Sequence, residues 1–176
     1  MQLEQTKKLK EFASLVIEKN KIHNLTAAQT TGFFLKTHIA DCTEAYQKIE
    51  SGLCNQVVDC GSGAGLPAIV WAIMNPNLMV FSVDSNQKKI AFQKHTRRLL
   101  GLKNLHPVAA RVEDFELEGE ATAVFKAFSS IKKGAQSLNK KNNFKNLYFF
   151  KKDDEKTKEE ITEASALLYD YKKHEY

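Results

Sequence analysis

The sequence has few of the residues that mark disulfide-rich, metal-binding or membrane-spanning proteins. Its three cysteines (Cys42, Cys54 and Cys60) are an odd number without a C-x-x-C pair, so they indicate neither a disulfide framework nor a zinc site. The five histidines show no H-E-x-x-H or similar spacing, and we expect no bound metal. Apolar runs of roughly 18 residues, the length of a membrane span, are absent. The N-terminal stretch MQLEQTKKLKEF lacks a signal-peptide core, so we expect a cytoplasmic protein.

The overall composition is that of an ordinary globular chain. Hydrophobic residues make up 43% and charged residues 27% of the 176 residues, which excludes disordered and collagen-like classes. This length fits a single domain, which we divide into an N-terminal helical extension (1–52) and an α/β core (53–176). Lysine and arginine outnumber the acids by 26 to 21, a net charge of +5 that permits a nucleic-acid partner without establishing one.

Hydrophobic periodicity predicts two helices followed by a regular alternation of strands and helices. Residues 3–20 have a helical period, and Thr30 or Thr31 is expected to cap a second helix that ends at Ser51-Gly52. The expected strands are 56–60, 78–83, 105–109, 121–125 and 146–150, and the expected later helices are 66–74, 86–100 and 154–169. The basic stretch 132–145 is interpreted as a weakly structured connection. This alternation predicts a doubly wound, mostly parallel sheet with helices on both faces.

A glycine-rich turn after the first strand is the strongest functional signal. Gly61, Gly63 and Gly65 form a G-x-G-x-G pattern between a strand and a helix, where the missing side chains let a ligand come close to the backbone. The pattern is neither the dinucleotide fingerprint, because Leu66 stands where the third glycine would be, nor a phosphate loop, because no Gly-Lys-Ser/Thr follows. The alternative is a tight strand-to-helix turn without a ligand.

Two acidic positions follow the next strands. Asp84 ends the second strand, where a carboxylate can accept both hydroxyls of a ribose. The alternative is that Asp84 or Ser85 caps the following helix, and the two roles can coexist. Val112-Glu113-Asp114 follows the third strand at the same edge of the sheet, as an adenine contact or as an exposed acidic loop.

Five motifs in order resemble the glucose-inhibited division protein B family (RsmG) over residues ~20 to ~152. They are N-L-T-A at 24–27, T-H-I-A-D at 37–41, D-C-G-S-G-A-G-L-P at 59–67, V-D-S-N-Q-K-K at 83–89 and R-V-E-D-F at 111–115. The resemblance implies a Rossmann-like class I methyltransferase fold, with S-adenosyl-L-methionine as cofactor and N7 of a guanine in 16S ribosomal RNA as the methyl acceptor. It also implies cofactor contacts from Gly61, Leu66, Val112, Glu113 and Lys126.

The chain departs from the family pattern at two places. Lys126 stands where the family usually has arginine, and lysine lacks the planar fork of a guanidinium. Lys151-Lys152 stands where the family has Lys-Gly, and the tail beyond residue 160 is short. We therefore expect the sheet to be truncated at its last strand.

The implied reaction requires no general base, because guanine N7 offers a lone pair and carries no proton. The sequence contains no convincing nucleophile–base pair, and we assign no catalytic residue. His38 and Asp41 are candidates for the substrate side, although a histidine on a mainly apolar helix face is often simply half-buried. Cys60 is interpreted as a buried apolar residue.

The expected partner is 16S ribosomal RNA within the small ribosomal subunit. We expect the protein to be a monomer that does not bind a membrane. Phosphate contacts are expected from Lys21, Arg97, Arg98, Lys132, Lys133, Lys140 and Lys141, supported by Lys7, Lys8, Lys10 and Lys145. Two alternatives stay open: a methyltransferase with the same cofactor and another substrate, and a non-catalytic RNA-binding relative.

Overall fold

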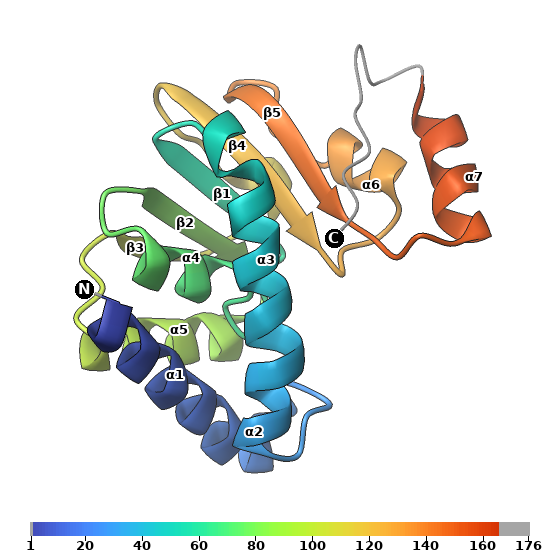
Figure 1. Cartoon of the computed structure of the whole chain (residues 1–176). Helices are drawn as coiled ribbons and strands as arrows, with labels where there is room; N and C mark the ends of the chain where they lie inside the picture. The colour runs from blue at the N-terminus through green and yellow to red at the C-terminus, as the bar shows by residue number, and fades with distance from the viewer. Residues whose placement is uncertain (1, 166–176) are drawn as a thin grey trace.

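The computed structural model describes residues 2–165, which contain one parallel β-sheet with helices against it (Figure 1). Its strands are β1 (Gln56–Cys60), β2 (Met79–Asp84), β3 (Leu105–Ala109), β4 (Glu120–Lys126) and β5 (Asn143–Phe150). Within the described residues they pair in the order β3-β2-β1-β4-β5, and every neighbouring pair is parallel. The order reverses between β1 and β4, so the carboxyl ends of these two strands form the switch point at which doubly wound sheets bind ligands. We call the carboxyl ends of β1–β4 and the loops after them the switch-point edge.

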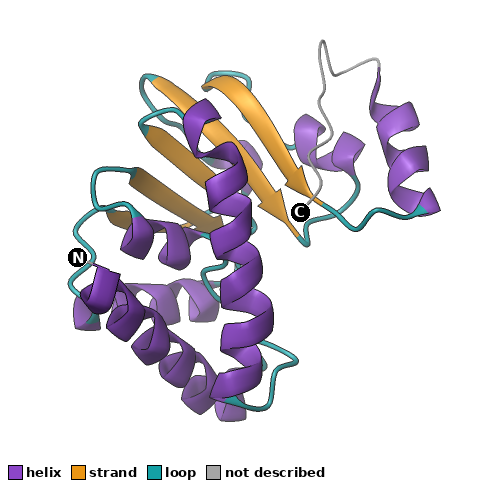
Figure 2. Ribbon diagram, in the orientation of Figure 1, coloured by secondary structure: helices purple, strands orange, loops and turns teal. Residues whose placement is uncertain are grey.

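Each face of the sheet packs against a separate apolar cluster, because side chains alternate along a strand. Val57, Val80 and Val124 point into the larger cluster, together with buried residues of the helices α1 (Gln2–His23), α3 (Ala40–Ile49) and α4 (Ala68–Met74). The neighbouring strand residues Val58 and Phe125 point into the other cluster. Figure 2 shows the resulting layers, with α1, α3, α4 and α5 (Gln87–Leu99) on one side of the strands. The predicted doubly wound parallel fold is confirmed.

The second N-terminal helix is interrupted by a π-helical turn. Thr30 is its N-cap and accepts the backbone N–H of Phe33. The short helix α2 (Thr31–Phe34) is followed by the π turn at Leu35–Ile39, by α3 and by a 3-10 turn at Glu50–Gly52. Nothing in the periodicity predicted the π turn, a feature that is frequent at functional sites.

The region 132–145 is more regular than we expected. It contains most of α6 (Ile131–Gln136) and the first three residues of β5. The side chain of Ser130 caps α6 by accepting the N–H of Lys133, and Gly134 lets the helix lie directly against the ring of Phe149. The prediction of a weakly structured connection was therefore wrong. The strand and the short helix carry many polar residues, so their hydrophobic pattern is too weak to recognise in the sequence.

The last described helix, α7 (Glu155–Ala164), is fastened to the end of β5 and to α6. Lys151 Nζ lies 2.9 Å from Glu160 Oε2, which also accepts the backbone N–H of Ile131 at 3.1 Å. The part of the expected helix beyond residue 165 lies outside the described residues. No helix within residues 2–165 is long and apolar enough to cross a membrane.

Candidate functional site

The three glycines after β1 have different roles. All three have positive φ angles (+77° at Gly61, +57° at Gly63 and +92° at Gly65), a conformation that other residues adopt at a cost. A Cβ at Gly61 would lie 2.6 Å from the ring of Phe128, and one at Gly65 would overlap Ile69. A Cβ at Gly63 would meet no atom nearer than 4.0 Å. Packing therefore requires glycine at 61 and 65, whereas the open side of Gly63 leaves room for a ligand.

Asp84 braces this turn from the end of β2. Its Oδ2 accepts the N–H of Gly63 at 2.9 Å and its Oδ1 accepts the N–H of Asn86 at 2.8 Å. Each carboxylate oxygen keeps a lone pair for a further donor, such as a ribose hydroxyl. Asn86 is the N-cap of α5, since its side chain accepts the N–H groups of Lys88 and Lys89. The capping alternative for Asp84 and Ser85 was therefore wrong.

Two buried polar residues at the turn were assigned no role from the sequence, although one of them, Asp59, begins the motif at 59–67. Gln93 is fully buried, and its Nε2 donates to Ser62 Oγ and to the carbonyl of Gly63, both at 2.9 Å. Asp59, at 1% exposure, accepts the N–H of Ala68 through Oδ2, while Oδ1 has no hydrogen-bond partner among the described residues. Burial raises the pKa of the Asp59 carboxyl to about 7, against the opposing effects of the Ala68 N–H and the Lys126 charge. Two features of the sequence could have indicated these residues. Gln93 is a polar residue on the buried side of a predicted helix, and Asp59 lies at the end of a predicted buried strand.

The N-terminal extension contributes a third group of residues through α3 and the π turn. Lys126 Nζ, at the end of β4, lies 2.8 Å from Asp41 Oδ2. His38 Nε2 is 3.4 Å from the hydroxyl of Thr26, and burial, followed by the Lys126 charge, lowers the pKa of His38 although Asp41 acts in the opposite direction. Ala127 follows Lys126 with a φ of +53°, a strained conformation for a residue with a side chain. The structure thus brings His38, Asp41 and Lys126 together.

The remaining expected cofactor residues lie at the same edge. Leu66 is half-buried and packs against the larger apolar cluster. Val112 is buried in a 3-10 turn that follows β3, and Glu113 beside it is exposed, 4.0 Å from Arg111 Nη1. Because β3 pairs with β2, this turn follows the strand next to Asp84.

The expected RNA-binding residues lie at two different ends of the sheet. Helices that connect parallel strands start at the carboxyl ends of the strands and return to the amino ends. Lys132 and Lys133 lie in the first turn of α6, near the switch-point edge. Lys21 lies next to Asn20, whose side chain donates to the carbonyl of Thr26 beside His38. Arg97 and Arg98 lie in the last turn of α5, and Lys140 and Lys141 lie between α6 and β5, both at the opposite edge.

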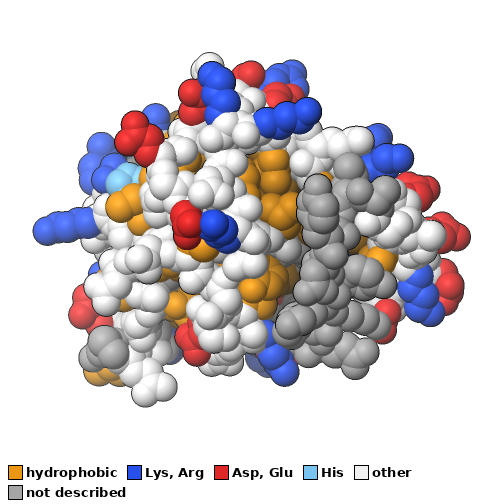
Figure 3. Space-filling model, turned by 90° about the horizontal axis from the view of Figure 1, so that it is seen from above, with side chains coloured by type: hydrophobic (Ala, Val, Ile, Leu, Met, Phe, Trp, Pro, Cys, Tyr) orange, Lys and Arg blue, Asp and Glu red, His pale blue; other side chains and the backbone are white. Residues whose placement is uncertain are grey.

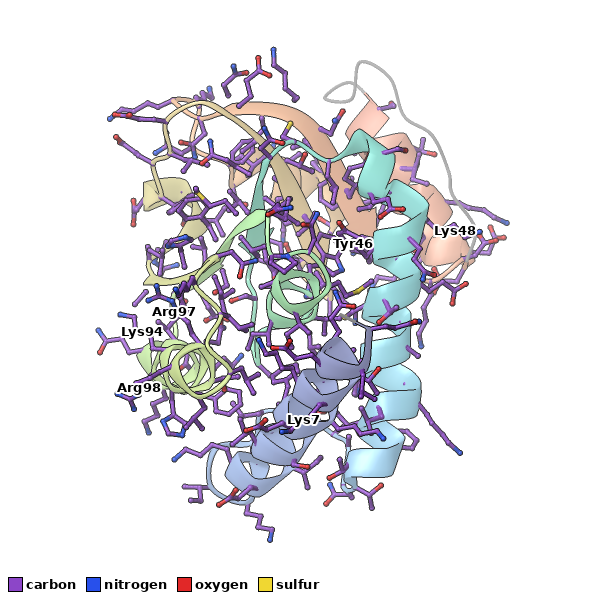
Figure 4. The ribbon with its side chains drawn as sticks, turned by 60° about the vertical axis from the view of Figure 1, so that its left-hand side comes forward. Lys7, Tyr46, Lys48, Lys94, Arg97 and Arg98 are labelled. Atoms are coloured by element: carbon purple, nitrogen blue, oxygen red, sulfur yellow. The ribbon has the colours of Figure 1, made fainter. Side chains whose placement is uncertain are left out.

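Uncompensated positive charge is concentrated on α5 and the loop after it. Residues 85–112 contain seven lysines and arginines and no acid. Figure 4 shows Lys94, Arg97 and Arg98 together on α5, and Lys7 on α1. Six of the seven form no ion pair with an acid within residues 2–165: Lys88, Lys89, Lys94, Arg97, Arg98 and Lys103.

Other lysines are neutralised by neighbouring acids. Lys141 pairs with Glu116, and Lys145 pairs with Glu120 at 2.9 Å. Acidic and basic side chains are interspersed on the face seen in Figure 3. The acid-free run of residues 85–112 was visible in the sequence, but Lys88, Lys89, Lys94 and Lys103 were not singled out.

Comparison with known proteins gives consistent matches. A family model described as GidB, rRNA small subunit methyltransferase G, matches residues 5–175. The ribosomal RNA small subunit methyltransferase G of Methylobacillus flagellatus is 40% identical over 129 residues, covering 73% of this chain and 62% of that protein. The Legionella pneumophila (strain Corby) protein of the same name is 36% identical over 124 residues, covering 70% of this chain and 58% of that protein. The chain therefore spans about three fifths of the length of these curated relatives.

Solved methyltransferase structures share the fold. A putative S-adenosyl-L-methionine-dependent methyltransferase from Methanococcus maripaludis has a TM-score of 0.55 at 13% identity, covering 90% of this chain and 71% of that chain. The tRNA (m1A58) methyltransferase TrmI from Aquifex aeolicus has a TM-score of 0.53 at 13% identity, covering 72% and 52% of the two chains. At this identity the likeness shows the fold alone.

Proposed function

The chain belongs to the family of rRNA small subunit methyltransferase G, and on that basis we propose that it transfers a methyl group from S-adenosylmethionine to N7 of a guanine in 16S ribosomal RNA. The structural observation that supports a cofactor site is the open side of Gly63, next to the carboxylate of Asp84. We also propose that the N-terminal extension and the α/β core work as one unit, since Asp41 and Lys126 join them at the switch-point edge.

The residues at the switch-point edge fit the cofactor. Gly63 provides a backbone that a ligand can approach, and Asp84 provides acceptors for ribose hydroxyls. The buried, unpartnered Oδ1 of Asp59 fits a donor such as the amino group of the cofactor's amino-acid part. We assign the adenine side to Val112 and Glu113 and the remaining contacts to Gly61, Gly65, Leu66 and Lys126.

The bound cofactor supplies an electrophilic methyl group on a sulfonium. The chain's own residues then need only to hold the guanine in line with that group and to exclude water, because N7 requires no deprotonation. The lowered pKa of His38 keeps its imidazole neutral at pH 7, so it adds no positive charge beside Lys126. We propose that His38 and Asp41 line the guanine side as positioning groups rather than as bases.

We propose that RNA phosphates contact the uncompensated cations of α5 together with the basic residues at the switch-point edge. An arginine or lysine without an acidic partner can release counterions from RNA on binding, whereas one already paired with an acid gains less. Arg97 and Arg98 therefore remain strong candidates, while Lys141 is partly neutralised by Glu116. Lys21, Lys132 and Lys133 would guide the target strand toward the cofactor. Lys140 lies with Lys141 at the opposite edge of the sheet.

Methyl transfer to isolated small ribosomal subunits that lack the modification tests the proposal. The purified protein with methyl-labelled S-adenosylmethionine is expected to label the RNA of these subunits. Labelling of a protein or small molecule instead would favour the same cofactor site with another substrate. RNA binding without any transfer would favour a non-catalytic RNA-binding relative.

A further inference from the structure

A positively charged side chain ends β4 at the point where the proposed cofactor would bring a second positive charge. The Lys126 side chain is only 18% exposed, and it reaches from the carboxyl end of β4 to Asp41, with Nζ 2.8 Å from Oδ2. The switch point lies between β1 and β4, so Lys126 stands beside it. Two cations in a partly buried site repel each other strongly unless an anion compensates one of them.

Asp41 is held firmly where it meets this charge. The next residue, Cys42, is fully buried, and its carbonyl accepts the indole N–H of Trp71 at 2.8 Å. One turn later the Tyr46 hydroxyl accepts the side-chain amide of Asn75 at 2.9 Å. These contacts fix α3 against α4, and the π turn directly before α3 sets the angular position at which Asp41 emerges. The carboxylate therefore cannot easily follow Lys126 to another place.

The other acids nearby do not replace Asp41. Asp59 is buried, gives one oxygen to the N–H of Ala68 and has a pKa raised by burial to about 7, so near neutral pH its charge is incomplete. Asp84 gives both oxygens to backbone N–H groups at the glycine turn. Among the described residues, Asp41 alone forms a direct ion pair with Lys126.

We propose that Asp41 is a positioning residue that neutralises Lys126 and thereby lets the switch-point edge accept the cationic S-adenosylmethionine as readily as the neutral S-adenosylhomocysteine. The inference rests on the proposed function, because it presumes that both molecules bind at this edge. An ammonium has three N–H donors, and Asp41 occupies one of them, so Lys126 can still donate to a bound ligand. The ion pair thus leaves Lys126 able to donate hydrogen bonds to the cofactor, while it removes most of the repulsion between the ammonium and the sulfonium.

The ratio of two dissociation constants tests this role. Calorimetry at pH 6.5, where the raised pKa of about 7 keeps Asp59 mostly protonated, gives the dissociation constants of S-adenosylmethionine and S-adenosylhomocysteine. The proteins compared are the wild type, Asp41→Asn and Asp41→Asn/Lys126→Met. Asp41→Asn adds one net positive charge at the site, so the ratio of the first constant to the second is expected to rise about tenfold. The double variant removes both charges and is expected to return the ratio to near the wild-type value.

Controls separate the charge effect from a loss of structure. If the ion pair has only a structural role, Asp41→Asn weakens the binding of both molecules equally and leaves the ratio of their dissociation constants unchanged. Glu120→Gln breaks the Lys145–Glu120 pair, which has nearly the same length at the amino end of β4, and should leave the ratio unchanged. If Asp41→Asn does not fold, Lys126→Met is expected to lower the ratio, by a smaller factor because Asp59 then ionises less readily.

The results distinguish a failure of the proposed function from a failure of the proposed role of Asp41. A wild type that binds neither molecule overturns the proposed function, and this inference with it. If the wild type binds both molecules, two results overturn only the charge-compensating role of Asp41. One is that Asp41→Asn leaves the ratio of the two dissociation constants unchanged. The other is that Asp41→Asn raises this ratio and the double variant does not lower it again.

Discussion

Asp84 accepts the backbone N–H of Gly63 at 2.9 Å, so the acid at the end of β2 directly shapes the glycine turn at the end of β1. Residues 21 positions apart in the sequence thus form one wall of the site. The bond also explains why Gly63 keeps its open side: the turn is fixed by Asp84 and Gln93 rather than by a side chain packed on Gly63 itself.

Gly63→Val is expected to abolish measurable binding of S-adenosylmethionine, because the new side chain would fill the open space. The substitution also strains the backbone, since Gly63 has a φ of +57°. Gly101 offers a matched control, with a φ of +63° and no atom within 4 Å of its Cβ position. Calorimetry should show normal binding for Gly101→Val, while both variants lose a similar amount of stability, about 1–2 kcal/mol. Undiminished binding by the Gly63 variant would remove the site assignment.

Asp84→Ala is expected to weaken binding of S-adenosylmethionine by roughly 1–3 kcal/mol, because ribose hydroxyls and the Gly63 N–H would lose their acceptor. Asp84→Asn retains one acceptor oxygen and should lose less. Titration calorimetry on both variants, alongside their thermal unfolding, separates the two contributions. If affinity is unchanged while the unfolding temperature falls, Asp84 only braces the turn.

Asp59→Asn is expected to change the pH dependence of stability. The folded-state pKa of Asp59 is raised from 3.8 to about 7, so between these values the unfolded chain ionises this carboxyl while the folded chain keeps it protonated. Wild-type stability therefore falls across this range relative to the variant, by about 2–4 kcal/mol once the pH exceeds 7. Urea unfolding of both proteins at several pH values measures the difference. A difference in the free energy of unfolding that stays constant with pH would contradict the raised pKa.

Replacing Arg97 and Arg98 by glutamine is expected to reduce the salt dependence of RNA affinity by about one unit of slope for each lost phosphate contact. Lys141→Gln and Lys145→Gln should change it less, because Glu116 and Glu120 already neutralise these lysines. Filter binding of small-subunit RNA over a range of salt concentrations gives the slopes. Equal reductions in the two pairs would show that α5 is not the preferred phosphate surface.

The fold was largely predictable from the sequence, because buried parallel strands and crossover helices have distinct periods. The placement of candidate site residues was predictable where they follow the ends of strands, as at Gly61–Gly65 and at Asp84. Their contacts with a cofactor stay predictions. The site was not predictable where it depends on long-range contacts. The ion pair between Asp41 and Lys126 joins residues that no local pattern relates, and no periodicity predicts the π turn at Leu35–Ile39 that precedes Asp41.

We propose above all that this chain methylates N7 of a guanine in small-subunit ribosomal RNA. The most direct measurement is the mapping of N7-methylguanine in that RNA, isolated from cells that lack their own enzyme and express either the wild type or Gly63→Val. We expect one guanine to become N7-methylated with the wild type and to stay unmodified with the variant. If cells that contain the folded wild-type protein yield small-subunit RNA without N7-methylguanine, the proposed activity is contradicted.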